Sequence, residues 1–248
     1  MSELRQNAAS RDWVVIATER AKRPHEFRNS RRRTFPAHDP KCPFCPGNEV
    51  QTPGESYVVR DSEGKWLVRA VPNKFAALSL LGSRQRKTQG LLLSMDGVGA
   101  HEVIIESPRH DQTIGTLPCD QLRLVLGAYR ARFRTLVEDH QIELVTLFRN
   151  HGEHAGTSLI HPHSQLIATP VVPPFVRERM DTARAHYDQW GTCLYCDMIN
   201  QELAAGERII LENGHFICFA PHASRSPFEM WVLPKRHSSS FSALTDEE

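Results

Sequence analysis

Residues 150–165 read NHGEHAGTSLIHPHSQ, in which a loop of small residues leads into a run of alternating polar and apolar residues. Side chains at positions i, i+2 and i+4 of a strand share one face, so we expect His161, His163 and Gln165 to project to the same side. The residues before them, from Gly152 to Ser158, leave backbone amides and hydroxyl groups free to hold an anion. An anion-binding loop beside two imidazoles predicts phosphorus chemistry.

This run resembles the active-site signature of the galactose-1-phosphate uridylyltransferase family, a branch of the histidine triad superfamily. The signature is an Asn, a glycine-rich loop ending in Ser, and His-Pro-His-x-Gln, and it matches from Asn150 through Ser158 to Gln165 without a gap. The resemblance implies nucleotidyl transfer, usually between UDP-glucose and galactose 1-phosphate. The alternative, that His161 and His163 are ordinary strand histidines, leaves the loop and the Gln unexplained.

The composition limits the other possibilities. The chain has 248 residues, 40% of them hydrophobic, which is enough for one large domain or two ordinary ones. Its 30 basic and 29 acidic residues leave a net charge of +1, so no overall field draws it to nucleic acid or to an anionic membrane. The first twelve residues lack the apolar core of a signal peptide, and no apolar run approaches the roughly 20 residues of a membrane helix. We therefore expect a cytoplasmic protein with no membrane partner.

A first metal site is indicated by Cys42 and Cys45, because two intervening residues let a tight turn present both thiolates to one zinc ion. The family takes its other two ligands from a His just after a strand and from the first His of His-Pro-His. The resemblance therefore implies that His110 and His161 complete the site. Such a tetrahedral site would be closed and structural, and it would fix the strand that carries the second His.

The resemblance also implies residues that bind the nucleotide. Arg20 and Arg23 match two arginines that contact phosphates in the family, and a planar guanidinium binds phosphate bidentately. Phe44 matches an aromatic residue that helps to line the base pocket, although a buried Phe over the cysteine turn is an equally good explanation. Asn73 matches an Asn at the nucleoside. Lys74 stands where the better known members carry Asp, which leaves the identity of the base open.

The chain looks like a duplication. Residues 228–237 align without gaps with residues 101–110, and both segments have Glu at the second position and Arg-His at the end. Each follows a Cys-x-x-Cys pair, so we predict Cys193, Cys196 and His237 as ligands of a second metal. Better known members fill that site with a carboxylate and histidines, so this chain resembles the branch that uses cysteines. Little sequence follows His237, and we expect the second half to be incomplete, without its fourth ligand.

The predicted fold class is α+β. Strands are expected at 11–17, 66–72, 101–110, 142–148, 214–220 and 228–237, and helices at about 118–136 and 175–190. The resemblance implies two histidine-triad-like halves, each an antiparallel sheet with covering helices, and commonly a homodimer whose active site borrows residues from the partner. We place the first half, with the active site, at 1–172 and the truncated second half at 173–248.

His163 is the predicted nucleophile, because a neutral imidazole offers a lone pair at pH 7 while His161 is held by zinc. The charge on the phosphoryl oxygens would be met by Arg20, Arg23, Asn150, Ser158 and Gln165. Hydrolases of the superfamily carry a His in place of Gln165. An amide cannot titrate, so it favours transfer to a second phosphate over hydrolysis.

Two alternatives stay open. A relative that uses ADP-glucose and inorganic phosphate is kept open by the second cysteine pair and by Lys74. A zinc-bearing nucleic-acid or protein-binding module is the alternative from another class. The two cysteine pairs are far apart in the sequence, whereas a compact zinc ribbon or finger needs them roughly 15 to 20 residues apart. The near-zero net charge also disfavours a nucleic-acid partner.

Overall fold

The computed structural model describes residues 2–17 and 34–248, so Arg20 and Arg23 lie outside the described residues. The described residues form two compact units, 34–172 in one and 2–17 with 173–248 in the other. The second unit brings the first strands of the chain together with its C-terminal part. The expected division into 1–172 and 173–248 treats those strands as part of the first half.

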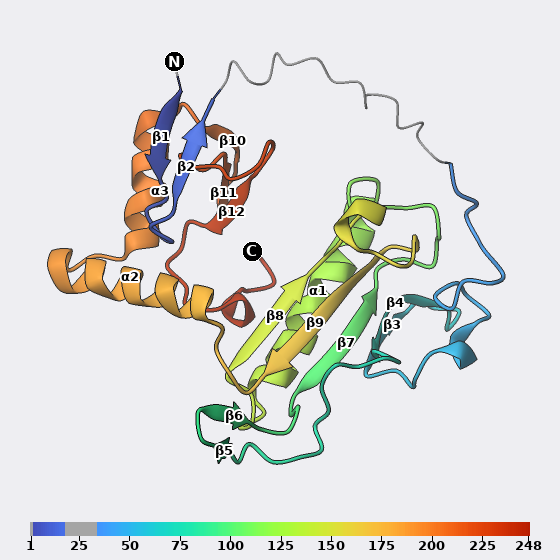
Figure 1. Cartoon of the computed structure of the whole chain (residues 1–248). Helices are drawn as coiled ribbons and strands as arrows, with labels where there is room; N and C mark the ends of the chain where they lie inside the picture. Colours follow the sequence, from blue (N-terminus) through green and yellow to red (C-terminus); the bar gives the residue numbers. More distant parts are fainter. Residues whose placement is uncertain (1, 18–33) are drawn as a thin grey trace. The chain divides into compact units, whose positions relative to one another are not determined.

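The unit of residues 34–172 is built on a five-stranded antiparallel sheet (Figure 1). The strands, in spatial order, are β3 (Tyr57–Arg60), β4 (Trp66–Pro72), β7 (Ala100–Ile105), β9 (His163–Thr169) and β8 (Leu144–Phe148). β7 pairs with β9 from Ala100 opposite Ala168 to Ile105 opposite His163. This register places the strand that carries His163 and Gln165 inside the sheet, between two hydrogen-bonded neighbours.

One face of the sheet is covered by α1 (Cys119–Val137) (Figure 1). The helix has apolar residues at helical spacing, and Val125 and Ala128 are completely buried. β9 alternates accordingly: Ser164, Leu166 and Ala168 are buried, and Tyr129 of α1 contacts Ser164. The residues between them are half-buried and project to the opposite face, which is therefore free to carry a site.

Shorter elements complete this unit. β5 (Lys87–Gln89) and β6 (Leu92–Ser94) form a hairpin, η2 (Glu49–Gln51) follows the first cysteine pair, and η3 (Glu153–Ala155) lies in the loop before β9. In that loop Gly152 and Gly156 have φ values of 84° and 81°. Side chains with a Cβ atom rarely adopt these angles, so the two glycines allow the tight path of the loop.

The other unit contains two sheets and two helices. β1 (Glu3–Gln6) pairs with β2 (Trp13–Ile16), and β10 (Ile209–Glu212), β11 (Phe216–Phe219) and β12 (Trp231–Pro234) form a three-stranded antiparallel sheet. The helices are α2 (Pro174–Trp190) and α3 (Leu194–Ala205), and η4 (Phe241–Ala243) lies near the C-terminus. The core of this unit contains Ile199, Ile217 and Phe219. The guanidinium of Arg5 in β1 donates to the backbone carbonyl of His222 at 3.2 Å, which connects the β1–β2 hairpin to the C-terminal part of the unit.

The α+β class with antiparallel sheets is confirmed, and β4 has the predicted bounds. The strand expected at 101–110 ends at Ile105, because the following segment turns to bring His110 beside His161. The strand with the two histidines begins only at His163. Pro162 has no N–H for a ladder, and its carbonyl accepts a hydrogen bond from the Glu106 amide at 3.0 Å.

Candidate active site

The four ligands expected for the first metal lie together. Cys42, Cys45, His110 and His161 are all buried, and their ligand atoms lie within 4.8 Å of one another. Cys45 Sγ is 3.6 Å from His110 Nδ1 and 3.5 Å from His161 Nδ1. Bond lengths of about 2.3 Å to sulfur and about 2.0 Å to nitrogen give a tetrahedron with S···N edges of about 3.5 Å. The donor set and its spacing therefore fit a tetrahedral zinc ion.

The electrostatics of the cluster also fit a cation. Burial raises the pKa of the Cys42 thiol to about 11 and lowers the pKa of His161 to about 4. The imidazole is consequently neutral at pH 7, and a thiolate at this place requires a positive partner. His161 Nε2–H donates to the carbonyl of Ser107 at 2.7 Å, so its lone pair lies on Nδ1, the atom that faces Cys45.

His163 has the opposite tautomer. Its Nδ1 is 2.8 Å from the carbonyl oxygen of His161, which can only accept, so Nδ1 carries the hydrogen and Nε2 carries the lone pair. The ring centroid of Phe44 lies 5.4 Å from that of His163 and 6.1 Å from that of His161, both in edge-to-face contact. Phe44 is itself 8% exposed. The backbone and Phe44 thus hold a half-buried imidazole with a free Nε2.

Gln165 and Asn73 meet at one further side chain, His101 of β7. His101 Nε2 is 2.8 Å from Gln165 Oε1 and 3.1 Å from Asn73 Nδ2. The backbone N–H of Asn73 donates to the backbone carbonyl of His101 at 2.8 Å, and the side-chain Oδ1 of Asn73 accepts from the backbone N–H of Phe75 at 2.9 Å. The structure therefore joins two expected site residues, far apart in the sequence, through a histidine that the sequence analysis did not single out.

Asn150 and Ser158 belong to the segment between β8 and β9. Phe148, the last residue of β8, pairs with Gln165, and Asn150 follows two residues after the end of that strand. Ser158 is exposed at the end of the small-residue loop. Lys74 is exposed as well.

A buried polar network supports β9 on the side that faces α1. The carboxylate of Glu106 is completely buried and pairs with Arg149 Nε at 3.1 Å. It also accepts hydrogen bonds from the hydroxyl groups of Tyr129 at 2.6 Å and Ser164 at 2.5 Å. Burial and the neighbouring carboxylate raise the pKa of Tyr129, so the phenol keeps its proton. Because Ser164 lies between His163 and Gln165, this network fixes the backbone that carries both side chains.

Neither the pairing of Glu106 with Arg149 nor the place of His101 is indicated by a sequence pattern. Glu106 follows an apolar strand and precedes Ser-Pro, where an isolated acid usually lies at the surface. Arg149 directly precedes Asn150, but nothing in the spacing pairs it with Glu106. His101 lies two residues ahead of Val103, the strand partner of Gln165, so only the strand register could have revealed its place.

The residues predicted for a second metal also lie together. Cys193, Cys196 and His237 have ligand atoms within 4.8 Å of one another, and Cys196 Sγ is 3.3 Å from His237 Nδ1. This group is partly exposed. Cys193 is the residue before α3 and Cys196 lies in its first turn, so the pair sits at a helix start instead of in a loop knuckle. The CxxC spacing still presents both sulfurs to one side, because residues i and i+3 adjoin at a helix surface.

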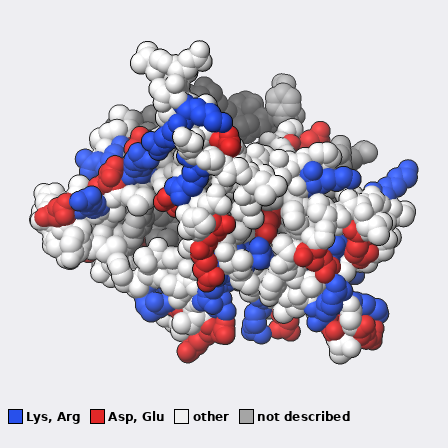
Figure 2. All heavy atoms as spheres, turned by 90° about the horizontal axis from the view of Figure 1, so that it is seen from below, with Lys and Arg blue, Asp and Glu red and all other residues white. Residues whose placement is uncertain are grey.

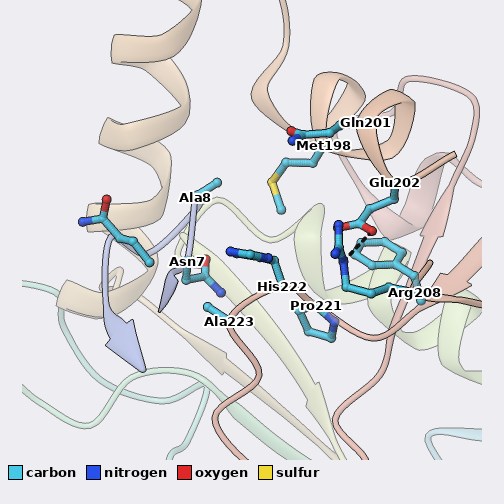
Figure 3. A pocket seen from close by; sticks show the side chains of 11 residues that line it. Asn7, Ala8, Met198, Gln201, Glu202, Arg208, Pro221, His222 and Ala223 are labelled. Carbon is cyan, nitrogen blue, oxygen red and sulfur yellow. Dashed lines mark hydrogen bonds and ion pairs between the residues drawn. The ribbon is translucent and has the colours of Figure 1, made fainter. Parts of the chain in front are cut away.

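A small cavity of about 140 Å³ lies in the unit that contains the second group (Figure 3). Met198, Gln201 and Glu202 of α3 line one side, and Asn7 and His222 lie opposite. The ion pair between Arg208 and Glu202, at 2.9 Å, forms part of its wall. None of the expected site residues within the described part of the chain lines this cavity.

The surface charge agrees with the composition. On the face seen in Figure 2, Lys and Arg side chains are interspersed with Asp and Glu side chains. Among the helices of the described residues, none is both long and apolar enough to cross a bilayer. A site for an anionic substrate therefore depends on local groups and not on an overall field.

The buried cluster of two cysteines and two histidines lies beside His163, on the face of the sheet opposite α1, and no partner of His163 Nε2 is found among the described residues. This arrangement has the chemistry of a histidine-based group-transfer site. The family model for galactose-1-phosphate uridyl transferase, N-terminal domain, matches residues 1–173. The chain belongs to this family. Its members named galactose-1-phosphate uridylyltransferases are nucleotidyltransferases, and so is this chain.

Individual relatives extend the likeness beyond residue 173. An ADP-glucose phosphorylase of Arabidopsis thaliana is 34% identical over 250 residues, which cover 98% of this chain and 69% of the relative. A galactose-1-phosphate uridylyltransferase of Haemophilus influenzae is 30% identical over 247 residues, 98% of this chain and 68% of the relative. The crystal structure of an Arabidopsis thaliana ADP-glucose phosphorylase with bound ADP-glucose superposes with a TM-score of 0.81 at 32% identity. That alignment covers all of this chain and 72% of that chain.

Proposed function

We propose that the protein transfers a nucleoside monophosphate from a nucleotide sugar to a second phosphate compound through a covalent intermediate on His163. The observation that carries the proposal is the hydrogen bond from His163 Nδ1 to the His161 carbonyl, which leaves the Nε2 lone pair available. A neutral imidazole with this tautomer is a nucleophile at pH 7 without a separate base.

The first step forms a bond between His163 Nε2 and the α-phosphorus, and the bond from that phosphorus to the sugar 1-phosphate breaks with its electron pair. The imidazole becomes positively charged, and the carbonyl of His161 that accepts from Nδ1 stabilises this charge. In the second step an oxygen of the acceptor phosphate attacks the same phosphorus and the P–N bond returns its electrons to Nε2. A sugar phosphate leaves as a stable anion, so neither step needs a proton donor at the place of Gln165.

Several polar groups are proposed to hold the phosphoryl oxygens during both steps: Arg20, Arg23, Asn150, Ser158 and Gln165. The two arginines lie outside the described residues and enter through the family resemblance. Phe44 and Asn73 are proposed for the nucleoside. Since Phe44 is buried against both imidazoles, its larger effect is expected on the orientation of His163.

We propose zinc as the ion of both cysteine–histidine groups. In the first group a bound ion supplies a structural link, because two thiolates and two imidazoles leave no open position for a substrate. His161, held by that group and by Ser107, then fixes the carbonyl to which His163 donates. The second group offers three ligands of this chain.

Two nucleotide sugars are candidates. UDP-glucose, with galactose 1-phosphate as acceptor, follows from the family to which the chain belongs. ADP-glucose, with inorganic phosphate as acceptor, is favoured by a specific observation: the Arabidopsis thaliana relative named for that activity is 34% identical, against 30% for the Haemophilus influenzae uridylyltransferase. The exposed Lys74 next to Asn73 is a further difference from the better known uridylyltransferases.

The two candidates are distinguished by turnover. We expect either glucose 1-phosphate release from UDP-glucose that requires galactose 1-phosphate, or release from ADP-glucose that requires inorganic phosphate, each with ping-pong kinetics. Both pairs should be assayed on the same preparation, with the crossed pairs as controls. Sequential kinetics would contradict transfer through a covalent intermediate. So would the release of more than one equivalent of glucose 1-phosphate per protein chain in the absence of any acceptor.

The proposal includes a homodimer in the cytoplasm. The dimer follows from the family resemblance. The cytoplasm is a compartment in which the free cysteines of the two groups would stay reduced and able to bind metal. Light scattering on the purified protein measures the first, and fractionation of cells that produce it measures the second.

A further inference from the structure

Two neighbours of His101, the Ala77 backbone amide and the Gln165 side chain, select its tautomer. Its Nδ1 faces the backbone amide of Ala77 at 3.3 Å, and this amide can only donate. Nδ1 must therefore hold the lone pair and Nε2 the hydrogen. The Nε2–H group is 2.8 Å from Gln165 Oε1, a favourable donor-to-acceptor contact.

This bond decides which end of the Gln165 amide is free. An amide has an accepting oxygen and a donating NH2 group, and a phosphoryl oxygen is stabilised only by the donor. With Oε1 engaged by His101, the NH2 group is the end that remains for a ligand on this face of the sheet. If the amide turned over, its NH2 group would meet the Nε2–H of His101, and its carbonyl would be presented to the phosphate.

The side-chain amide of Asn73 is oriented in a similar way. Its Oδ1 is fixed by the Phe75 amide at 2.9 Å, so the group near His101 Nε2, at 3.1 Å, is its NH2 group. Two donors face one another there, and the Asn73 NH2 group cannot use His101 as an acceptor. Its hydrogens remain for a ligand. His101 thus lies between the side-chain amides of Gln165 and Asn73, and it accepts a hydrogen bond from the NH2 group of neither.

We propose that His101 is a positioning residue that orients Gln165 so that its NH2 group faces the transferred phosphoryl group. The inference rests on the proposed transfer through His163. The register supports it, since His101 pairs with Ile167 and lies diagonally across from Gln165 on the same face of β7 and β9. The residue would act through Gln165 and would not touch the reacting atoms.

Two polar substitutions test this role. In His101→Gln the longer side chain can place an amide donor where Nε2–H was, and in His101→Asn the amide reaches only the place of Nδ1. We expect His101→Asn to form the nucleotidyl adduct roughly fivefold to tenfold more slowly, the value of one oriented hydrogen bond of about 1 kcal/mol. We expect His101→Gln to stay within about threefold of the wild type. The readout is the single-turnover rate of adduct formation.

A double-mutant cycle with Gln165→Ala decides whether His101 acts through Gln165. In the Gln165→Ala background, His101→Asn should cause no further loss beyond twofold. Metal content and the unfolding midpoint of every variant serve as controls for folding. Equal and independent losses in both backgrounds, or equal rates of the Asn and Gln variants, would overturn the inference. A wild-type protein that forms no adduct would instead refute the proposed function, so the two failures are distinct.

Discussion

At the scale of single residues, hydrogen bonds select what each histidine can do. His161 donates through Nε2 and offers Nδ1 to the cysteines, whereas His163 donates through Nδ1 and keeps Nε2 free. The residue types alone predicted a ligand and a nucleophile. They could not predict the tautomers, because each is set by a carbonyl whose position depends on the fold, and they gave no signal for His101.

Glu106 is expected to contribute strongly to stability, because its completely buried carboxylate pairs with Arg149. Replacing it by Gln removes the charge opposite Arg149, whose side chain is only 16% exposed, and we expect a loss of about 3 kcal/mol in the free energy of unfolding. Glu143→Gln is the matched control, because its pair with Arg84 is half exposed and should contribute less than about 1 kcal/mol. Urea unfolding of both variants measures the difference. Similar losses for the two would show that the buried network is not specially stabilising.

At the scale of elements, the first metal group joins three segments that are distant in sequence. Cys42 and Cys45 come from the turn before η2, His110 from the segment after β7, and His161 from the residues just before β9. Burial disfavours the charged form of the Cys42 thiol and raises its pKa. A dication compensates that cost and crosslinks the segments, so metal and fold are expected to be coupled.

Cys42→Ser tests that coupling. We expect this variant to lose one zinc ion per chain, together with stability on the order of several kcal/mol. Cys119→Ser is the control, because Cys119 is exposed and belongs to neither metal group. Elemental analysis and thermal unfolding report the two quantities. Full zinc occupancy in Cys42→Ser with an unchanged midpoint would show that the four-ligand assignment is wrong.

Helices and strands with a strong local sequence pattern were predicted, and those with a weak or ambiguous pattern were not. β4 and α1 were predicted because an apolar run and a long helical period are strong local signals. α3 was not predicted, because its start coincides with the second cysteine pair, which was interpreted only as a source of metal ligands. The alternation of polar and apolar residues suggested that the strand already includes His161. β9 begins only at His163, because Pro162 has no N–H to donate to a neighbouring strand.

At the scale of the whole molecule, the sequence predicted the family and the α+β class but not the grouping of the chain. The hairpin of β1 and β2 belongs to the unit of residues 173–248, and its contacts with that unit include the ion pair of Asp12 with Arg225. Such a long-range contact leaves no local pattern. That the two groups of cysteine and histidine side chains lie together was predicted despite similar separations, because cysteine spacing and the family signature restrict the candidates.

The central claim is that His163 carries the nucleotide, and the most direct measurement is the mass of the protein after brief exposure to a nucleotide sugar. Incubation with UDP-glucose and with ADP-glucose separately, followed by intact mass and peptide mapping, should find one acid-labile nucleotidyl group with one of the two. The group should lie on the peptide that contains His163, and His163→Gly should lack it while keeping its zinc and its fold. An adduct that persists in His163→Gly, or no adduct with either sugar in a zinc-loaded wild-type protein that turns over, would contradict the account.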